Sequence, residues 1–179
     1  MASHVISQRT QNRATLISAA QIIGASLLIA LCAQIRIPLP FSPIPLTFQT
    51  FAVLLIGSLL GSKKGALSVI AYLAEVSLGL PFLQGGMVNP FALVGITAGY
   101  LIGFVVQAYF VGWFFEKRKT LSFGKTLSVL SLACLVQLAL GTLWLAHFVG
   151  WNNDLPMGFY PFVPSEVLKA MAVISLFRK

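Results

Sequence analysis

The chain has 179 residues, of which 58% are hydrophobic and only 9% are charged, and its formal net charge is +8. Because a soluble domain carries about 25% charged residues, this composition excludes a soluble globular protein and predicts a membrane protein, formed by one domain over residues 1–179. We interpret the positive charge as cytoplasmic loops rather than a nucleic-acid surface, since lysine and arginine gather on the cytoplasmic side of membrane proteins.

Apolar stretches of the length of membrane-spanning helices recur along the chain. A helix needs about 20 mostly apolar residues, with a range of about 17–25, to cross the hydrocarbon core. The first stretch is longer than the apolar core of a signal peptide, which has about 7–15 residues, so we interpret it as a spanning helix. Six helices are predicted, at residues 14–35, 46–60, 65–80, 91–115, 126–148 and 159–177.

Proline, glycine and charged residues separate the predicted helices. Residues 37–45 contain four prolines, which lack the backbone donor that a continuing helix needs. A tight cationic turn is predicted at 61–65 and a cationic loop at 116–125, whereas 80–90 and 150–158 predict irregular, nearly uncharged loops. We expect the uncharged loops to cap an apolar cavity, although ordinary irregular loops fit the same composition.

The lysine and arginine residues predict the orientation in the membrane. Ten of the twelve fall on one side of a six-helix arrangement, Arg36 falls on the other side, and Lys169 lies within the last helix. Because cytoplasmic loops carry an excess of these residues, both chain termini are predicted to be cytoplasmic. The expected fold is an all-α, multi-pass protein of the cell (inner) membrane.

The sequence contains no familiar enzyme signature. The H-E-x-x-H, C-x-x-C and G-x-S-x-G patterns are all absent. Gly124, Lys125 and Thr126 are similar to the end of a phosphate-binding loop, but the leading glycine would have to stand where Lys119 is. We therefore expect no enzymatic activity, no metal and no cofactor.

Glu75, Glu166 and Lys169 are ionisable residues inside predicted helices. Each would cost about 2.5–3.5 kcal/mol at the centre of a spanning helix, so such residues usually face a cavity or a partner. Glu166 and Lys169 are three residues apart and share one helical face. They either line a cavity or form only a mutual ion pair, and Glu75 either faces a cavity or lies between helices.

Small residues are dense on the first predicted helix. Ala20 and Gly24 form a small-xxx-small pair, which lets another helix approach closely. The approaching helix can belong to the same bundle or to a partner protein.

Five segments of the sequence resemble the BioY family. They are 37–73, which joins the proline-rich segment to LTFQTF, and then 79–86 (GLPFLQGG), 95–104 (GITAGYLIGF), 141–145 (GTLWL) and 164–170 (PSEVLKA). BioY proteins are the biotin-binding S components of energy-coupling factor (ECF) vitamin transporters. The resemblance implies six membrane helices and an outward-facing biotin cavity, with a membrane T component and paired ATPases as partners.

The resemblance also implies binding positions. The family's motif Pro-Gly-Asp-x-x-Lys-Ala has Glu166 as its acid here, and we expect Glu166 to accept an N–H of the biotin ureido group. Lys169 either donates to the ureido carbonyl or pairs with the carboxylate of the tail. The other expected binding residues are Gln84, Gly86, Met87, Asn89, Tyr100 and Trp144. In the family the T component docks on the first helix, where Ala20 and Gly24 stand here.

Two other functions remain open at this stage. The ligand of the cavity could be another small vitamin, or the chain could be a membrane enzyme that acts on lipid with Glu75, Glu166 or His147 as acid–base groups. The lack of a nucleophile paired with an acid and a base argues against the enzyme.

Overall fold

The structure is a computed structural model that describes residues 2–117 and 122–177, with side chains from residue 12 onward. Its elements are α1 (Ala2–Ala33), β1 (Arg36–Ile37), β2 (Leu46–Thr47), α2 (Gln49–Ser77), α3 (Ala98–Lys117), α4 (Phe123–Val149), α5 (Asp154–Gly158) and α6 (Val163–Leu176). In the described part of the chain, five helical segments are long and apolar enough to cross a membrane. A mostly helical fold with several helices of membrane-spanning length is therefore confirmed, whereas the paired strands β1 and β2 differ from the all-α prediction. Residues 118–121 of the predicted cationic loop, and 178–179, lie outside the described residues.

The two short helices predicted after the proline-rich segment are the halves of α2. Gly61 separates them, because its φ of +80° and ψ of −178° are not helical. A Cβ built on Gly65 would lie 3.1 Å from the Cα of Gly57, whereas eight residues of a continuous helix span about 12 Å. The chain therefore reverses direction at Gly61. The predicted turn at 61–65 is shorter than expected, since only Gly61 leaves the helical conformation.

Contacts from α3 stabilise this reversal. The Glu116 carboxylate accepts the backbone N–H of Ser62 at 2.9 Å and the Ser62 hydroxyl at 2.8 Å. Glu116 thus caps the second half of α2, whose first N–H groups have no partner within the helix. Gly112 allows the approach, because a Cβ there would overlap the backbone of Gly61 and Ser62.

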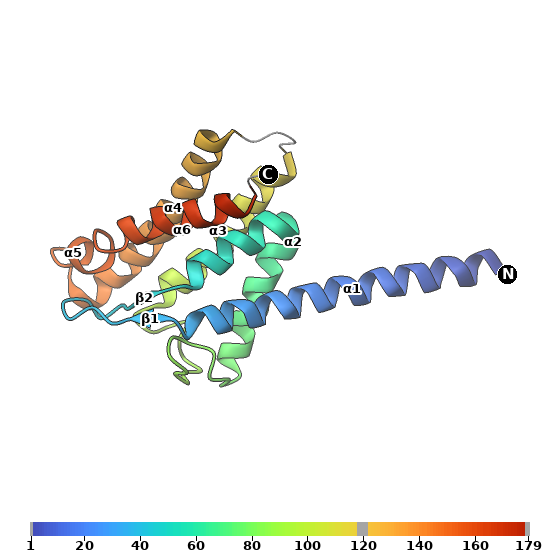
Figure 1. Ribbon diagram of the computed structural model, residues 1–179. Helices are drawn as coiled ribbons and strands as arrows, with labels where there is room; N and C mark the ends of the chain where they lie inside the picture. Colours follow the sequence, from blue (N-terminus) through green and yellow to red (C-terminus); the bar gives the residue numbers. More distant parts are fainter. Residues whose placement is uncertain (1, 118–121, 178–179) are drawn as a thin grey trace.

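The helices pack around α2 and α4. Helix α2 contacts α1, α3 and α6, while α4 contacts α3, α5 and α6. The core side chains between them are apolar and include Ile29, Leu54, Tyr72, Leu130 and Leu145. The N-terminal part of α1 extends beyond this bundle (Figure 1), and most of its side chains from residue 12 to 24 are exposed.

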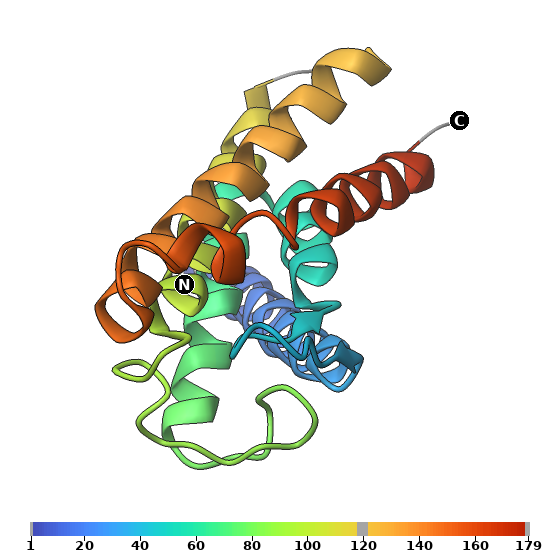
Figure 2. The ribbon, with the colours of Figure 1, turned by 90° about the vertical axis from the view of Figure 1, so that its left-hand side faces the viewer.

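The irregular segments gather at the end of the molecule opposite the N-terminal part of α1 (Figures 1 and 2). Strands β1 and β2 pair antiparallel on either side of the proline-rich segment. The Ser42 hydroxyl in that segment donates to the carbonyl of Met157 at 2.6 Å, which ties it to α5. The loop after α2 is anchored to α1, because Gly85 donates its backbone N–H to the carbonyl of Ala33.

Two predicted helices begin later than expected. Helix α3 starts at Ala98 rather than at residue 91, because residues 91–97 form turns that extend the loop. The last predicted helix, 159–177, is reduced to α6, which follows the separate short α5. Pro164 lies in the first turn of α6, where the missing N–H has no helical partner. Apolar composition alone therefore did not distinguish helix from irregular backbone in these segments.

Candidate ligand-binding cavity

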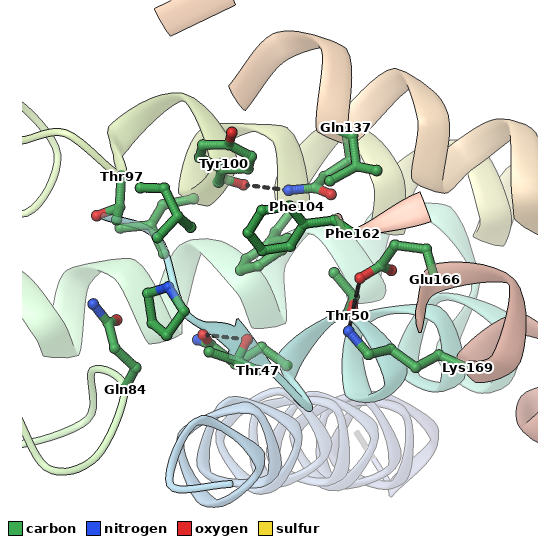
Figure 3. A pocket seen from close by; sticks show the side chains of 15 residues that line it. Thr47, Thr50, Gln84, Thr97, Tyr100, Phe104, Gln137, Phe162, Glu166 and Lys169 are labelled. Carbon is green, nitrogen blue, oxygen red and sulfur yellow. Dashed lines mark hydrogen bonds and ion pairs between the residues drawn. The ribbon is translucent and has the colours of Figure 1, made fainter. Parts of the chain in front are cut away.

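A cavity lies among α2, α3, α4 and α6, next to β2 and the loop after α2 (Figure 3). Most of the lining surface is apolar, although eight of the fifteen lining residues, which come from different elements, have polar side chains. The lining residues are Ile44, Pro45, Thr47, Gln49, Thr50, Gln84, Thr97, Tyr100, Leu101, Phe104, Gln137, Leu138, Phe162, Glu166 and Lys169. Such a combination is typical of a small-molecule site.

A charged cluster closes one end of this cavity. The Lys169 Nζ lies 2.7 Å from the Glu166 Oε1 and donates to the Thr50 hydroxyl at 2.7 Å. The Thr50 hydroxyl in turn donates to the Glu166 Oε1 at 2.9 Å. Glu166 is 3% exposed and Lys169 is 9% exposed, so these hydrogen bonds replace water around both charges. The first turns of α6 place both side chains on one face, toward α2.

Two acceptors near this cluster remain unpaired. The Glu166 Oε2 and the Gln137 Oε1 are buried and have no hydrogen-bond partner among the described residues. The Gln137 amide is oriented by its Nε2, which donates to the Tyr100 carbonyl at 3.3 Å. Because an unpaired buried acceptor costs about 1–3 kcal/mol, both oxygens are suited to accept N–H groups of a ligand.

The opposite end of the cavity is formed by Gln84 and Thr97 (Figure 3). Aromatic rings of Tyr100, Phe104 and Phe162 lie between the two ends. The Tyr100 hydroxyl is already used in a contact with α5, because it donates to the Gly158 carbonyl at 2.9 Å. The cavity thus has a charged polar end, an apolar middle and an uncharged polar end.

Four of the eight predicted binding residues line the cavity: Gln84, Tyr100, Glu166 and Lys169. Gly86, Met87 and Asn89 belong to the same loop as Gln84 but are not part of the lining. The Met87 side chain is 46% exposed, and the Asn89 Oδ1 accepts the backbone N–H of Phe91. The side chains of Met87 and Asn89, and the backbone of Gly86, therefore do not line the cavity in this conformation.

The structure does not bring Trp144 to the cavity. Its indole N–H donates to the Gly95 carbonyl at 2.9 Å, and its ring lines a separate outer groove with Gly99 and His147. Trp144 stands seven residues, about two turns, beyond Gln137 on α4, where α4 meets the start of α3. Gln137 and Leu138 are the residues of α4 that line the cavity.

Sequence reasoning missed several lining residues, above all Thr50 and Gln137. A polar side chain within an apolar helix is a signal for a cavity, and it applies to Gln137. The LTFQT segment is part of the resemblance to the BioY family, and it supplies the lining residues Thr47, Gln49 and Thr50. Gln49 is oriented by its Nε2, which donates to the buried Tyr72 hydroxyl at 2.8 Å.

Glu75 and the small residues of α1 lie away from the cavity. The Glu75 Oε1 accepts the Ser26 hydroxyl at 2.8 Å, so Glu75 lies between α1 and α2. Ala20 and Gly24 are exposed, and a Cβ on Gly24 would meet no atom within 4 Å. The described part of this chain therefore does not cover the small face of α1.

Apolar helices of membrane-spanning length around a cavity with two polar ends define a multi-pass membrane protein with an internal small-molecule site. The chain belongs to the BioY family, which it matches over residues 7–179, as the sequence segments predicted.

Individual relatives agree with this assignment. The chain is 34% identical over 140 residues to a probable biotin transporter BioY of Pyrococcus horikoshii, which covers 78% of this chain and 82% of the relative. It is 34% identical over 163 residues to the biotin transporter BioY of Rhodobacter capsulatus, with 82% and 83% covered. These names describe transporters, in agreement with the expectation that the chain is not an enzyme.

The fold is similar to a solved structure. The crystal structure of the S-component for biotin from an ECF-type ABC transporter superposes with a TM-score of 0.82 and 26% sequence identity. The similarity covers 92% of this chain and 90% of the solved one.

Proposed function

We propose that the chain is the biotin-binding S component of an ECF-type transporter and serves biotin uptake across the cell membrane. Its relatives are named as biotin transporters, and its structural neighbour is an S-component for biotin. Biotin is the transported substrate in this proposal and not a cofactor. One substrate-binding domain over the whole chain accounts for the elements described.

The pair of unpaired acceptors beside Lys169 carries this proposal. The ureido group of biotin has two N–H donors and one carbonyl acceptor. The Glu166 Oε2 and the Gln137 Oε1 supply two acceptors. An ammonium has three donors, of which Lys169 directs two at Glu166 and Thr50, so the third is free for the ureido carbonyl. The aromatic middle of the cavity suits the apolar rings and tail.

A six-crossing arrangement with both termini in the cytoplasm completes the proposal. The reversal at Gly61 supports two short crossings within α2, although the whole of α2 counts as one long apolar helix. Lys63 and Lys64 follow this reversal, whereas the nearly uncharged loops gather at the other end of the molecule (Figure 1). This distribution is the one that the positive-inside tendency favours.

The proposed partners are a membrane T component and ATPase subunits, as the ECF-type ABC transporter of the structural neighbour suggests. The exposed Ala20 and Gly24 on α1 are the proposed contact surface for the T component.

Ligand binding by the purified protein tests the proposal. Biotin should raise the unfolding temperature, since a ligand at one hundred times its dissociation constant stabilises the folded state by about 2.7 kcal/mol. Riboflavin, thiamine and phospholipid head groups are the comparison ligands and should leave the unfolding temperature unchanged. Stabilisation by one of these and not by biotin would contradict the substrate assignment.

Uptake of labelled biotin by cells tests the role in transport. Cells that make the chain together with the T component and ATPases should accumulate biotin, and the Glu166→Ala, Lys169→Met variant should not.

A further inference from the structure

Arg36 is a cation next to the cavity, outside its lining, that the binding scheme above leaves unused. In the β1–β2 ribbon its Cα pairs with that of Thr47, a residue of the lining. Its guanidinium lies against Gly85, which follows the lining residue Gln84 in the chain. Arg36 is therefore adjacent to two segments that form the cavity, and one of them is the end occupied by Gln84.

The loop after α2 leaves space at Gly85 for the Arg36 side chain. Gly85 has a φ of +70°, a conformation that side chains rarely adopt, and a Cβ there would overlap the guanidinium of Arg36. This part of the loop is held against the end of α1 by two hydrogen bonds. Gly85 donates its backbone N–H to the Ala33 carbonyl at 3.2 Å, and the Gln34 Nε2 donates to the Leu83 carbonyl at 3.4 Å. The position of Arg36 is thus defined by local packing.

The guanidinium of Arg36 has donors that are available to a ligand. The side chain is exposed, and among the described residues it has no hydrogen-bond or ion-pair partner. The segments 34–48, 78–97 and 150–162 contain one other charged residue, Asp154, whose side chain is buried. Arg36 therefore dominates the charge at this end, and its planar fork of donors matches a carboxylate.

We infer that Arg36 binds the carboxylate of the transported ligand at the outer end of the cavity. The inference rests on the proposed function, because biotin carries a carboxylate on a flexible tail. Figure 3 shows Gln84 and Thr97 at the end opposite Glu166 and Lys169. Lys169 is held between Glu166 and Thr50, so it serves the ureido end, and the tail carboxylate extends toward Arg36.

A comparison of biotin with biotinamide, which has the same rings and an uncharged tail, tests this assignment. The wild-type protein should bind biotin about three- to tenfold more tightly than biotinamide in calorimetry. Arg36→Gln should lose this preference by weakening biotin binding while leaving biotinamide binding unchanged. Arg36→Lys should retain part of the preference, because it keeps the charge without the fork. High salt should reduce the wild-type preference, since the pair is exposed.

Lys63→Gln is the matched control, because it removes another exposed cation, beside the Gly61 reversal and away from the cavity lining, and it should change neither affinity. An equal loss of affinity for both ligands in Arg36→Gln would overturn the inference, and so would an unchanged preference. If Arg36→Gln does not fold, an unchanged preference in Arg36→Lys overturns it equally. Failure of the proposed function gives a different result, in which the wild-type protein binds neither biotin nor biotinamide.

Discussion

Glu166 and Lys169 combine the two arrangements that their spacing allowed. They form a mutual ion pair, with the Lys169 Nζ 2.7 Å from the Glu166 Oε1. They also line the cavity, where the second carboxylate oxygen of Glu166 has no partner among the described residues. The ion pair therefore keeps two buried charges together and still leaves hydrogen-bonding capacity for a ligand.

Lys169→Met should affect stability and binding together. Removing one partner of a buried ion pair costs about 3–5 kcal/mol, because the other charge is left uncompensated. Glu166→Gln combined with Lys169→Met should recover much of the unfolding temperature, since no buried charge remains. Biotin affinity of this folded double variant should still be at least tenfold lower, equivalent to about 1.4 kcal/mol. An unchanged affinity in the double variant would show that the pair is only structural.

Gln137→Met should weaken biotin binding about five- to tenfold with little change in stability. The substitution removes the unpaired Oε1 that the proposal assigns to a ureido N–H, together with one 3.3 Å hydrogen bond to Tyr100. Gln107→Met is the matched control, because Gln107 is equally buried and has an unpaired Oε1 but does not line the cavity. Isothermal calorimetry should find normal biotin affinity for Gln107→Met. Equal losses in both variants would indicate a general packing effect.

The candidate site was only partly predictable from residue type. Glu166 and Lys169 could be predicted because charges inside a spanning helix are rare and need a partner. Thr50 could not be assigned in the same way, since hydroxyl groups in helices often bond to their own backbone, as Ser58 does with the Leu54 carbonyl. Gln137 is a polar side chain within an apolar helix, but Gln107 is another and does not line the cavity. Trp144 was predicted to bind the ligand, but its indole N–H donates to the Gly95 carbonyl before α3, a contact that residue type does not reveal.

At the scale of helices, the sequence pattern located the segments better than their ends. The break within α2 was predicted from the glycine and lysine residues at 61–65, and the structure places it at Gly61, whose positive φ is tolerated by glycine. The start of α3 was misplaced, since residues 91–97 are apolar but form turns. Apolar composition reports burial in membrane or protein, whereas the backbone conformation of this segment depends on the loop contacts around it.

Gly112→Ala should strongly destabilise the protein through the α2 reversal. A Cβ at position 112 would overlap the backbone of Gly61 and Ser62, so α3 would have to move away and Glu116 would lose its capping bonds. Gly124→Ala is the matched control, because that helical glycine has no atom within 4 Å of a built Cβ. It should stabilise α4 slightly, since alanine favours helix over glycine by up to about 1 kcal/mol. Thermal unfolding in detergent should separate the two variants, and equal unfolding temperatures would contradict the close approach at Gly61.

At the scale of the whole molecule, most of the basic residues are predicted to lie on the side opposite the loops that border the cavity. The predicted cytoplasmic side carries ten of the twelve basic residues, whereas the nearly uncharged loops gather at the other end of the molecule (Figure 1) and contribute Ile44, Gln84 and Thr97 to the cavity lining. We expect a ligand that enters from the loop side to meet Arg36 first and the buried Glu166–Lys169 pair last. The site therefore lies apart from α1 between residues 12 and 24, which leaves that surface free for a separate partner.

Gly24→Leu should weaken association with the T component and leave biotin affinity unchanged. Gly24 is exposed and a Cβ there meets no atom within 4 Å, so the larger side chain can be accommodated by this chain but not by a helix packed closely on Ala20 and Gly24. Ala19→Leu is the control, because Ala19 is also exposed and lies on a different face of α1. Co-purification with the T component should fall for Gly24→Leu alone, while calorimetry should give the same biotin affinity for both variants. Loss of biotin binding together with co-purification in Gly24→Leu would mean that this face of α1 supports the bundle itself, and equal co-purification in both variants would place the docking surface elsewhere.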